Sequence, residues 1–211
     1  TATNGSRTRM YFQTYRKIAT TELGIQRLLA VWRGEHTFTR FDLSSQDYTE
    51  LAQELAMRSD SGGEDILLEQ RGRIENPDRL AEFDFSLPAL SSEQSVRALF
   101  VESLADVQNR ARESWVLDGL GFIHHPLRAG TSERHIEAGL DLLEEVQRTG
   151  DIFFPERWVS TILAGHRTSS AAELVRRYLE ENRTLSSRLR EKVLQAYDGL
   201  ERAALISQAV N

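Results

Sequence analysis

The sequence predicts an all-α protein, and three observations support that fold class. Apolar residues recur three and four positions apart along almost the whole chain, which is the spacing that places side chains on one face of a helix. No stretch longer than four residues alternates convincingly between apolar and polar side chains, as a half-buried strand would. Only four prolines occur, and all of them can sit at helix ends or in turns.

The predicted helices follow one another closely along the chain. They are marked by apolar residues at 11–18, 25–32, 48–55, 66–74, 77–83, 96–100, 116–123, 136–143, 159–163, 174–178 and 189–204. The most conspicuous connection lies at residues 124–131. The apolar run at 152–155 (IFFP) is predicted to anchor the helix that follows it.

Residue types at helix ends support these assignments. Asn76 precedes Pro77, and asparagine is a good cap while proline is tolerated at the first helical position. Two capping boxes are predicted, Ser91 with Gln94 and Ser170 with Glu173. The glycines expected to end helices are Gly34, Gly150 and Gly165.

Many amphipathic helices with short connections favour antiparallel pairs stacked side by side. This arrangement is an α-solenoid, a HEAT- or armadillo-like superhelix. No sequence period is visible, so any repeats must be degenerate. We therefore expect a single helical-repeat domain over residues 1–211. The absence of an initiator methionine suggests that the chain is a piece of a longer polypeptide.

Composition disfavours several classes of function. There is no cysteine, so disulfides, thiolate zinc sites, iron–sulfur clusters and a cysteine nucleophile are excluded. The formal net charge of −6 disfavours nucleic-acid binding, which needs a basic face. No stretch approaches the roughly 20 apolar residues of a membrane span, and the polar N-terminus does not resemble a signal peptide. The sequence leaves the compartment unknown.

No residue pattern in the chain predicts catalysis by this chain alone. A metal site would have to group His124, His125 and His135 with Glu133 or Glu137, but there is no His-x-x-x-His pair. We therefore interpret the histidine pair as loop residues that hydrogen-bond at a helix end. Gly-x-Ser-x-Gly and phosphate-binding glycine loops are also absent. We predict no catalytic and no metal-ligating residue.

Five segments taken together resemble the C-terminal region of bacterial zinc aminopeptidases of the aminopeptidase N type. These segments are 76–79 (NPDR), 124–128 (HHPLR), 142–158 (LLEEVQRTGDIFFPERW), 165–167 (GHR) and 189–196 (LREKVLQA). The similarity extends over essentially the whole chain and is densest at residues 95–205. No single segment is diagnostic; the ordered set is what resembles the family.

The resemblance implies a non-catalytic role. In that family the C-terminal domain is a superhelix of paired helices that closes the cavity around a zinc site held by an upstream catalytic domain. The His-Glu-x-x-His motif of that domain is absent here, so zinc would belong to the parent enzyme. The implied partners are the catalytic domain of the same polypeptide and peptide substrates. Basic side chains of this domain meet the substrate's C-terminal end in the family, and the candidates for cavity contacts are Arg128, Arg167, His124, His125 and His166.

Three alternatives stay open from the sequence. The chain could be a freestanding helical-repeat scaffold that binds another protein on its concave face. It could be an autonomous enzyme whose histidines bind a metal ion. Nucleic-acid binding through the arginines is the weakest alternative. For Arg128 and Arg167, the competing interpretation is that both bind helix carbonyls or nearby carboxylates.

Overall fold

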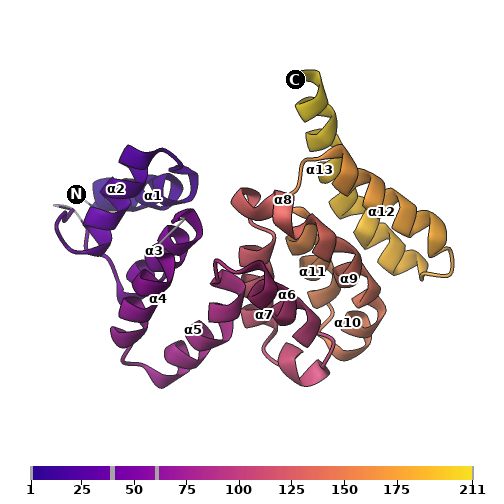
Figure 1. Cartoon of the computed structure of the whole chain (residues 1–211), viewed down its shortest axis with the longest axis horizontal. Coiled ribbons are helices and arrows are strands. Elements are labelled where there is room, and N and C mark those ends of the chain that lie inside the picture. The colour runs from indigo at the N-terminus through magenta and orange to yellow at the C-terminus, as the bar shows by residue number, and fades with distance from the viewer. Residues whose placement is uncertain (1, 39–40, 60–61, 211) are drawn as a thin grey trace. The chain divides into compact units, whose positions relative to one another are not determined.

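The structure, a computed structural model, describes residues 2–38, 41–59 and 62–210. The described residues form helices, turns and connections and contain no strand, which confirms the predicted all-α class (Figure 1). The chain divides into two compact units, Thr1–Leu87 and Pro88–Asn211. The single helical-repeat domain expected over residues 1–211 stays a prediction. No helix in the described part of the chain combines the length and apolarity that a membrane span needs.

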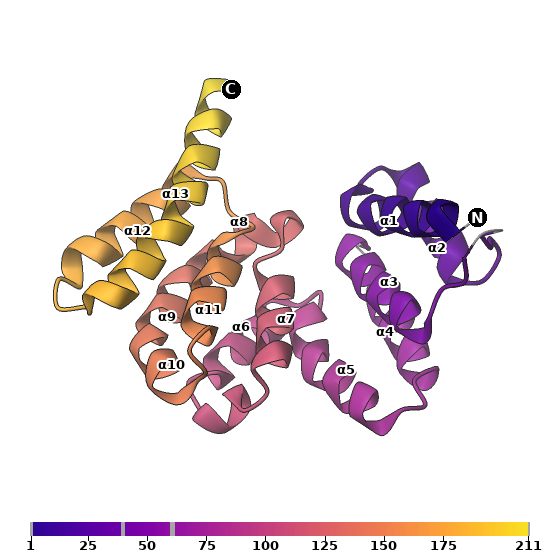
Figure 2. The same ribbon diagram turned by 180° about the vertical axis from the view of Figure 1, so that it is seen from behind.

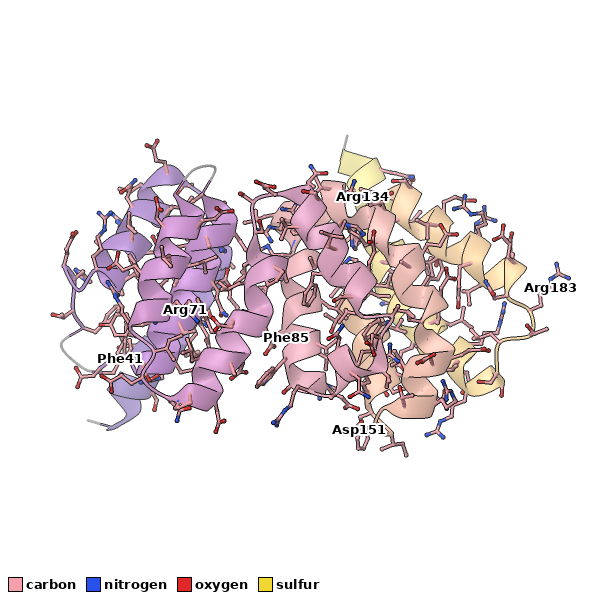
Figure 3. All side chains as sticks on the ribbon, turned by 60° about the horizontal axis from the view of Figure 1, so that its bottom comes forward. Phe41, Arg71, Phe85, Arg134, Asp151 and Arg183 are labelled. Atoms are coloured by element: carbon pink, nitrogen blue, oxygen red, sulfur yellow. The ribbon has the colours of Figure 1, made fainter. Side chains whose placement is uncertain are left out.

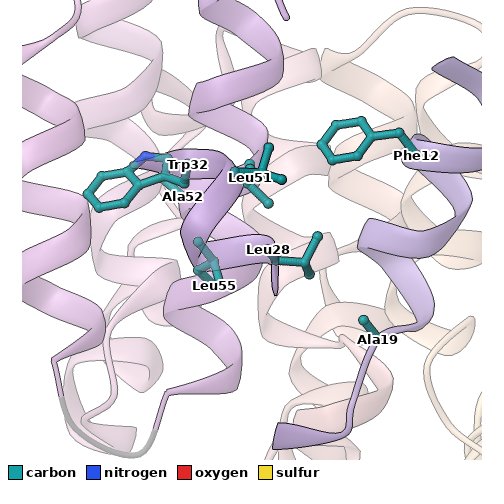
Figure 4. Packing of buried hydrophobic residues seen from close by; sticks show 8 residues of the cluster. Phe12, Ala19, Leu28, Trp32, Leu51, Ala52 and Leu55 are labelled. Atoms are coloured by element: carbon teal, nitrogen blue, oxygen red, sulfur yellow. The ribbon is translucent and has the colours of Figure 1, made fainter. Parts of the chain in front are cut away.

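Unit 1 is built around the second and third helices. Its elements are α1 (Ala2–Ile18), α2 (Glu22–Trp32), α3 (Ser45–Arg58), α4 (Gly63–Gly72) and most of α5 (Pro77–Leu90). Figure 4 shows the apolar core between them, where Leu28 and Trp32 of α2 meet Leu51 and Leu55 of α3. The indole Nε1 of Trp32 donates to the Oε1 atom of Gln70 on α4 at 2.9 Å, so even the polar edge of this buried ring is satisfied.

Unit 2 contains helices of very different length, from several single turns to the 24-residue α13. Its elements are α6 (Gln94–Ser103), η1 (Val107–Arg110), α7 (Glu113–Ile123), η2 (Pro126–Arg128), α8 (Ala129–Ser132), η3 (Glu133–His135), α9 (Ile136–Asp141), α10 (Leu143–Thr149), α11 (Phe154–Leu163), α12 (Ser169–Glu181) and α13 (Ser187–Val210). Helices α12 and α13 lie side by side in both views (Figure 1, Figure 2). Trp158 of α11 is buried, and its Nε1 donates to the Gly139 carbonyl of α9 at 2.8 Å.

The helix starts agree only partly with the predicted caps. The Oδ1 atom of Asn76 accepts hydrogen bonds from the amides of Asp78 and Arg79, which confirms the predicted start of α5. The capping box at Ser91 is wrong, because the Ser91 hydroxyl accepts from the Glu93 amide and α6 begins later, at Gln94.

The capping box at Ser170 is also wrong. Thr168 has the extended conformation of a cap and accepts from the Ala171 amide, so Ser170 lies inside α12. Both residues are good capping types, and the sequence alone did not distinguish between them.

Pro88 lies inside α5, although a helix end or a turn was expected for every proline. It removes the hydrogen bond to the Asp84 carbonyl and crowds that carbonyl, and because it lies in the last turn only two helical residues follow the disturbance. The division between the two units falls between Leu87 and Pro88.

The apolar run at 152–155 anchors α11 with only half of its residues. Phe154 is 1% exposed and Pro155 is buried, whereas Ile152 and Phe153 are 63% and 66% exposed. The Oδ1 atom of Asp151 accepts from the amides of Phe153 and Phe154 at 2.7 and 2.8 Å, which fixes this turn. The prediction that this run anchors the next helix is therefore confirmed for Phe154 and Pro155 and wrong for Ile152 and Phe153.

Side-chain hydrogen bonds within each unit repeatedly join residues 33 to 42 positions apart, and many of them are close to 40. In unit 1 the separations are 38 for Arg9 with Asp47, 39 for Arg58 with Ala19, 38 for Trp32 with Gln70 and 41 for Arg73 with Trp32. In unit 2 they are 39 for Arg128 with Ala89, 38 for Glu113 with Asp151, 42 for His124 with His166 and 38 for Tyr178 with Leu140. In unit 1 these bonds connect α1 with α3 and α2 with α4.

Candidate functional site

The five candidate residues of the sequence analysis lie on two connections of unit 2. His124 follows the last residue of α7, and His125 and Arg128 belong to the turn after it. His166 and Arg167 lie between α11 and α12. The structure brings His124 and His166 together and gives the other three residues different surroundings.

The two connections cross at Gly165. A Cβ atom added to Gly165 would overlap the carbonyl oxygen of His124 and lie 2.8 Å from its carbonyl carbon. A residue without a side chain is therefore required for this close approach of two backbones. Gly165 was expected only to end a helix; the crossing gives it a second, tertiary role.

His124 and His166 form a buried pair at this crossing. Their side chains are 2% and 3% exposed, and Nδ1 of His124 lies 2.9 Å from Nε2 of His166. One of the two nitrogens must carry the hydrogen and the other must accept it. The outer nitrogens, Nε2 of His124 and Nδ1 of His166, are buried without a hydrogen-bond partner in the described residues. This geometry suits two neutral imidazoles.

The surroundings of the pair disfavour a positive charge on it. Burial lowers the pKa of His124 well below its ordinary value, and the neighbouring His166 and His135 lower it further. Burial also lowers the pKa of His166, although the carboxylate of Glu133 acts in the opposite direction. Burial, then Arg134, then Arg97 lower the pKa of His135, and Glu102 opposes them. Arg134 itself projects from the surface of unit 2 (Figure 3).

The side chain of Arg128 is hydrogen-bonded to the end of a helix. Its guanidinium donates to the carbonyls of Ala89 and Leu90 at 2.8 and 2.7 Å, at the C-terminus of α5. Burial, together with the neighbouring Arg97, lowers the pKa of Arg128 to about 10. Its donors satisfy carbonyls that a helix end leaves free, which is the competing interpretation stated for this residue.

Arg97 supports the same chain segment and was missed in the sequence analysis. It is 7% exposed and donates to the carbonyls of Ser91 and Ser92 at 2.7 and 2.8 Å. The signal was present, because Arg97 shares the spacing of Phe100, Val101 and Leu104, which are all buried. An arginine on the apolar face of a helix needs local acceptors.

His125 and Arg167 differ from the buried group. His125 is half-buried, and its Nδ1 accepts from the Leu127 amide at 3.3 Å within its own turn. Arg167 is exposed and takes part in none of the ion pairs found in the described part of the chain. Arg167 is therefore the candidate arginine whose guanidinium is free to meet a ligand.

The junction holds two connections of unit 2 together. Among residues 2–38, 41–59 and 62–210, no group of three or more histidine, aspartate or glutamate side chains is arranged to hold a metal ion. The histidine pair is closed to solvent and already shares a hydrogen, so it does not present a base to a substrate.

A second feature, missed by sequence reasoning, is an apolar cavity of about 490 Å³ in unit 1, between α1, α2 and residues 36–38. Tyr11 and Tyr15, which marked the first predicted helix, form part of its wall. A signal for the cavity was present in the sequence: Tyr11, Phe12 and Tyr15 are more aromatic residues than one buried face of α1 needs.

No protein-family model, curated protein or solved structure matches this chain.

Proposed function

We propose that this chain is the non-catalytic, all-helical C-terminal domain of a zinc metallo-aminopeptidase. Its role is to close the cavity around the active site and to gate or position peptide substrates. The catalytic part of the same polypeptide would supply the zinc-bound water and the general base that cleave the peptide bond. The proposal rests on the resemblance of the five ordered segments, and the structure offers two kinds of support.

The observation that carries the proposal is the junction of residues 124–128 with 165–167. These are two separate segments of the resemblance, and their histidines meet at 2.9 Å across a backbone crossing that requires Gly165. A third segment, at 142–158, contributes the buried Phe154 and Trp158, whose rings lie 5.7 Å apart. The resemblance therefore falls on residues that pack within one unit.

The regular spacing of the tertiary hydrogen bonds supports the α-solenoid part of the proposal. In solenoids each repeat contacts its neighbours, so long-range contacts fall one repeat length apart. The recurring separations run from 33 to 42 residues, so their upper end meets the HEAT and armadillo period of roughly 40 to 47 residues. Each repeat would be a helix pair, and a superhelix of such pairs presents a concave wall to a cavity.

The candidate arginines take different roles within this proposal. Arg128 stabilises the end of α5 and is not available to a substrate. Arg167 is exposed, and a guanidinium can bind a peptide's C-terminal carboxylate through two parallel hydrogen bonds. We assign the substrate contact to Arg167 and a positioning role to Arg128.

The test of the proposal uses the whole product of the gene that encodes these residues. We expect a longer polypeptide that carries His-Glu-x-x-His upstream, binds about one zinc ion and removes N-terminal residues from peptides, with loss of activity on chelation. A product without an upstream catalytic domain, zinc or peptidase activity would contradict the proposal and favour the freestanding scaffold. Stoichiometric zinc in the 211-residue chain alone would also contradict it.

The substrate role of Arg167 has its own test in the same enzyme. Arg167→Ala should raise KM about tenfold for peptides with a free C-terminal carboxylate and leave kcat unchanged, because a charge-assisted hydrogen bond is lost. Peptides ending in an amide should show no change. The control is Arg183→Ala, which removes another exposed arginine (Figure 3). Equal KM values for the two variants with every peptide length would remove Arg167 from the substrate path.

A further inference from the structure

A smaller cavity of unit 2 lies where the turn before α11 meets the start of α13. Its volume is about 260 Å³, slightly below the range of about 300–1,000 Å³ that is usual for drug-sized ligands. The side chains that line it are Gln147, Asp151, Ile152, Pro155, Arg188 and Lys192. The size suits a small metabolite, and the lining combines two cations, one carboxylate, one amide and an apolar wall.

Two cationic side chains of α13 contribute to the lining of this cavity. Arg188 and Lys192 are four residues apart, so both project from the same face of the helix. The ammonium nitrogen of Lys192 lies 3.3 Å from Oε2 of Glu156. Arg188 is exposed and belongs to none of the ion pairs found among residues 2–38, 41–59 and 62–210. Its guanidinium is therefore available to bind a carboxylate through two parallel hydrogen bonds.

Asp151 supplies the negative charge of the lining and lies at the surface of unit 2 (Figure 3). The amide of Phe153 does most to lower the pKa of Asp151; burial opposes it, and the amide of Phe154 and the charge of Arg157 lower the pKa further. The carboxyl is therefore ionised at neutral pH. An ionised carboxylate has about four acceptor positions, so Asp151 can accept from a ligand while its Oδ1 atom fixes the turn.

The third polar group of the lining is the side-chain amide of Gln147 on α10. Its Oε1 atom is buried and has no hydrogen-bond partner in the described part of the chain. A buried acceptor without a partner lowers the stability of the fold, and the terminal torsion of a glutamine side chain is soft. A rotation about that torsion lets the amide accept a hydrogen bond from a donor in the cavity. The cavity therefore offers an acceptor for an N–H group as well as a cation for a carboxylate.

The charges of the lining side chains indicate the charge of the ligand. The two cations Arg188 and Lys192 are offset by Asp151 in the lining and by Glu156, the ion-pair partner of Lys192. A ligand that carries one charge of each sign fits this arrangement better than a simple anion or cation. A free amino acid meets this condition with its carboxylate and its ammonium group. The uncharged N–H of a peptide end has less to gain from a carboxylate such as Asp151.

The apolar wall of the cavity indicates the side chain of the ligand. Ile152 is 63% exposed, and Pro155 beside it is buried. An aliphatic side chain placed against Ile152 removes apolar surface from water on both partners. The cavity therefore favours an amino acid with an aliphatic side chain over a polar one.

We propose that the cavity between α10, the turn before α11 and the start of α13 binds a free aliphatic α-amino acid. The carboxylate of the ligand pairs with Arg188, and its ammonium group donates to Asp151 and Gln147. The aliphatic side chain packs against Ile152. The inference concerns unit 2 alone and does not rest on the proposed function.

The experiment titrates the 211-residue chain with L-leucine and follows the binding by nuclear magnetic resonance. We expect saturable shifts that include the side-chain amide of Gln147, with a Kd of about 1 mM or lower. L-Leucinamide lacks the carboxylate, and N-acetyl-L-leucine lacks the ammonium group. Each should bind about tenfold more weakly than L-leucine, because each loses a charge-assisted hydrogen bond.

Two variants and one control test the assignment of the residues. Arg188→Gln should raise the Kd for L-leucine about tenfold, because it removes the cation that pairs with the carboxylate. Asp151→Asn should also raise the Kd about tenfold, and its side-chain oxygen can still accept from the amides that fix the turn. Arg183→Gln removes another exposed arginine, outside the cavity, and should leave the Kd unchanged (Figure 3).

Three outcomes would overturn the inference. The first is the absence of saturable shifts with L-leucine, and the second is an equal Kd for Arg188→Gln and Arg183→Gln. The third is an equal Kd for L-leucine and N-acetyl-L-leucine, which would assign the cavity to the C-terminal end of a peptide instead. Circular dichroism of each variant, matched to that of the natural chain, shows that a change in Kd reflects the cavity and not the fold.

Discussion

The histidine junction of unit 2 buries polar side chains, whereas the cavity of unit 1 leaves apolar side chains exposed. At the junction, polar groups from distant segments are buried together: His124 meets His166, and Arg128 binds the carbonyls of Ala89 and Leu90. At the cavity, apolar groups from one hairpin are left exposed, with Tyr11 at 63%. The first site is closed and occupied by the chain's own atoms; the second is open.

The contrast shows which kind of residue marks an interaction surface in this all-helical protein. Histidines and arginines at loops attract attention as chemistry, yet here most of them join one helix to the next. The aromatic residues of α1 look like ordinary core residues in the sequence, yet they line an open surface. The following predictions test whether the histidine junction is closed and structural and whether the apolar surface of α1 is open.

The largest effect is expected at the backbone crossing. Gly165→Ala should lower the free energy of unfolding by about 3 kcal/mol or more, because the new Cβ overlaps the His124 carbonyl and the two connections must separate. The measurement is urea denaturation followed by circular dichroism. Gly121→Ala is the control, since a Cβ there meets no atom within 4 Å and alanine favours the helix. A Gly165→Ala variant as stable as the control would show that the connections do not meet.

The next effect separates the two candidate arginines. Arg128→Met should destabilise the protein by about 2 kcal/mol, because it removes two donors from buried carbonyls while keeping much of the side-chain volume. Arg167→Met should change stability by less than about 0.5 kcal/mol, as expected for an exposed side chain. The measurement is the thermal unfolding of both variants, compared with that of the natural protein. Equal effects would contradict the assignment of different roles.

The histidine pair should make the protein sensitive to mild acid. In the folded state the pKa values of His124 and His166 lie below their ordinary value of 6.5. Below that pH the unfolded chain therefore binds more protons than the folded one, and stability falls as pH decreases. The urea midpoint should thus be lower at pH 5.5 than at pH 7.5.

Two variants separate the contribution of His124 and His166 to the pH dependence of stability from the contribution of the carboxylates. The double variant H124L/H166L removes both imidazoles and should reduce the dependence of the urea midpoint on pH, while His135, whose pKa is also lowered, retains a part of it. His36→Gln, which removes an exposed histidine of unit 1, is the control for the loss of an imidazole elsewhere in the chain. If the double variant keeps the full dependence, other groups are responsible for it.

The smallest effect on stability is expected at the open surface. Tyr11→Ser combined with Ile18→Ser should change the free energy of unfolding by less than about 0.5 kcal/mol, since both side chains are exposed. The same change should reduce the binding of an apolar fluorescent dye to the 211-residue chain, because it removes much of the exposed apolar patch. Gln13→Ser should alter neither property. A large loss of stability would place Tyr11 and Ile18 in the core instead.

Local patterns predicted the helices well because helix formation depends on spacing within the chain. The four-residue spacing of Leu28 and Trp32, and the Asn76 cap of α5, needed no tertiary information. The predicted end of α4 was wrong, because Ile74 fits the apolar pattern but lies beyond the helix, which ends at Gly72. The stretch from Pro126 to His135, expected to begin as a loop, forms short turns whose backbone follows from packing.

The candidate site depended on contacts that sequence spacing does not encode. His124 and His166 are 42 residues apart, and nothing local indicates that their connections cross. The need for a glycine at position 165 appears only when the His124 carbonyl is placed beside it. Likewise, Arg128 and Arg167 look alike in the sequence, and only the position of the α5 carboxyl end distinguishes them.

The most direct test of this account compares amide hydrogen exchange in the 211-residue chain with exchange in the whole gene product. Under the proposed function, we expect peptides covering residues 8–31 to exchange more slowly in the longer protein, because the rest of the polypeptide covers the exposed apolar side chains of α1 and α2 there. Peptides covering residues 120–128 and 162–166 should exchange equally in both, because their junction is complete within unit 2. Unchanged exchange at residues 8–31, or new protection confined to the histidine junction, would contradict the account.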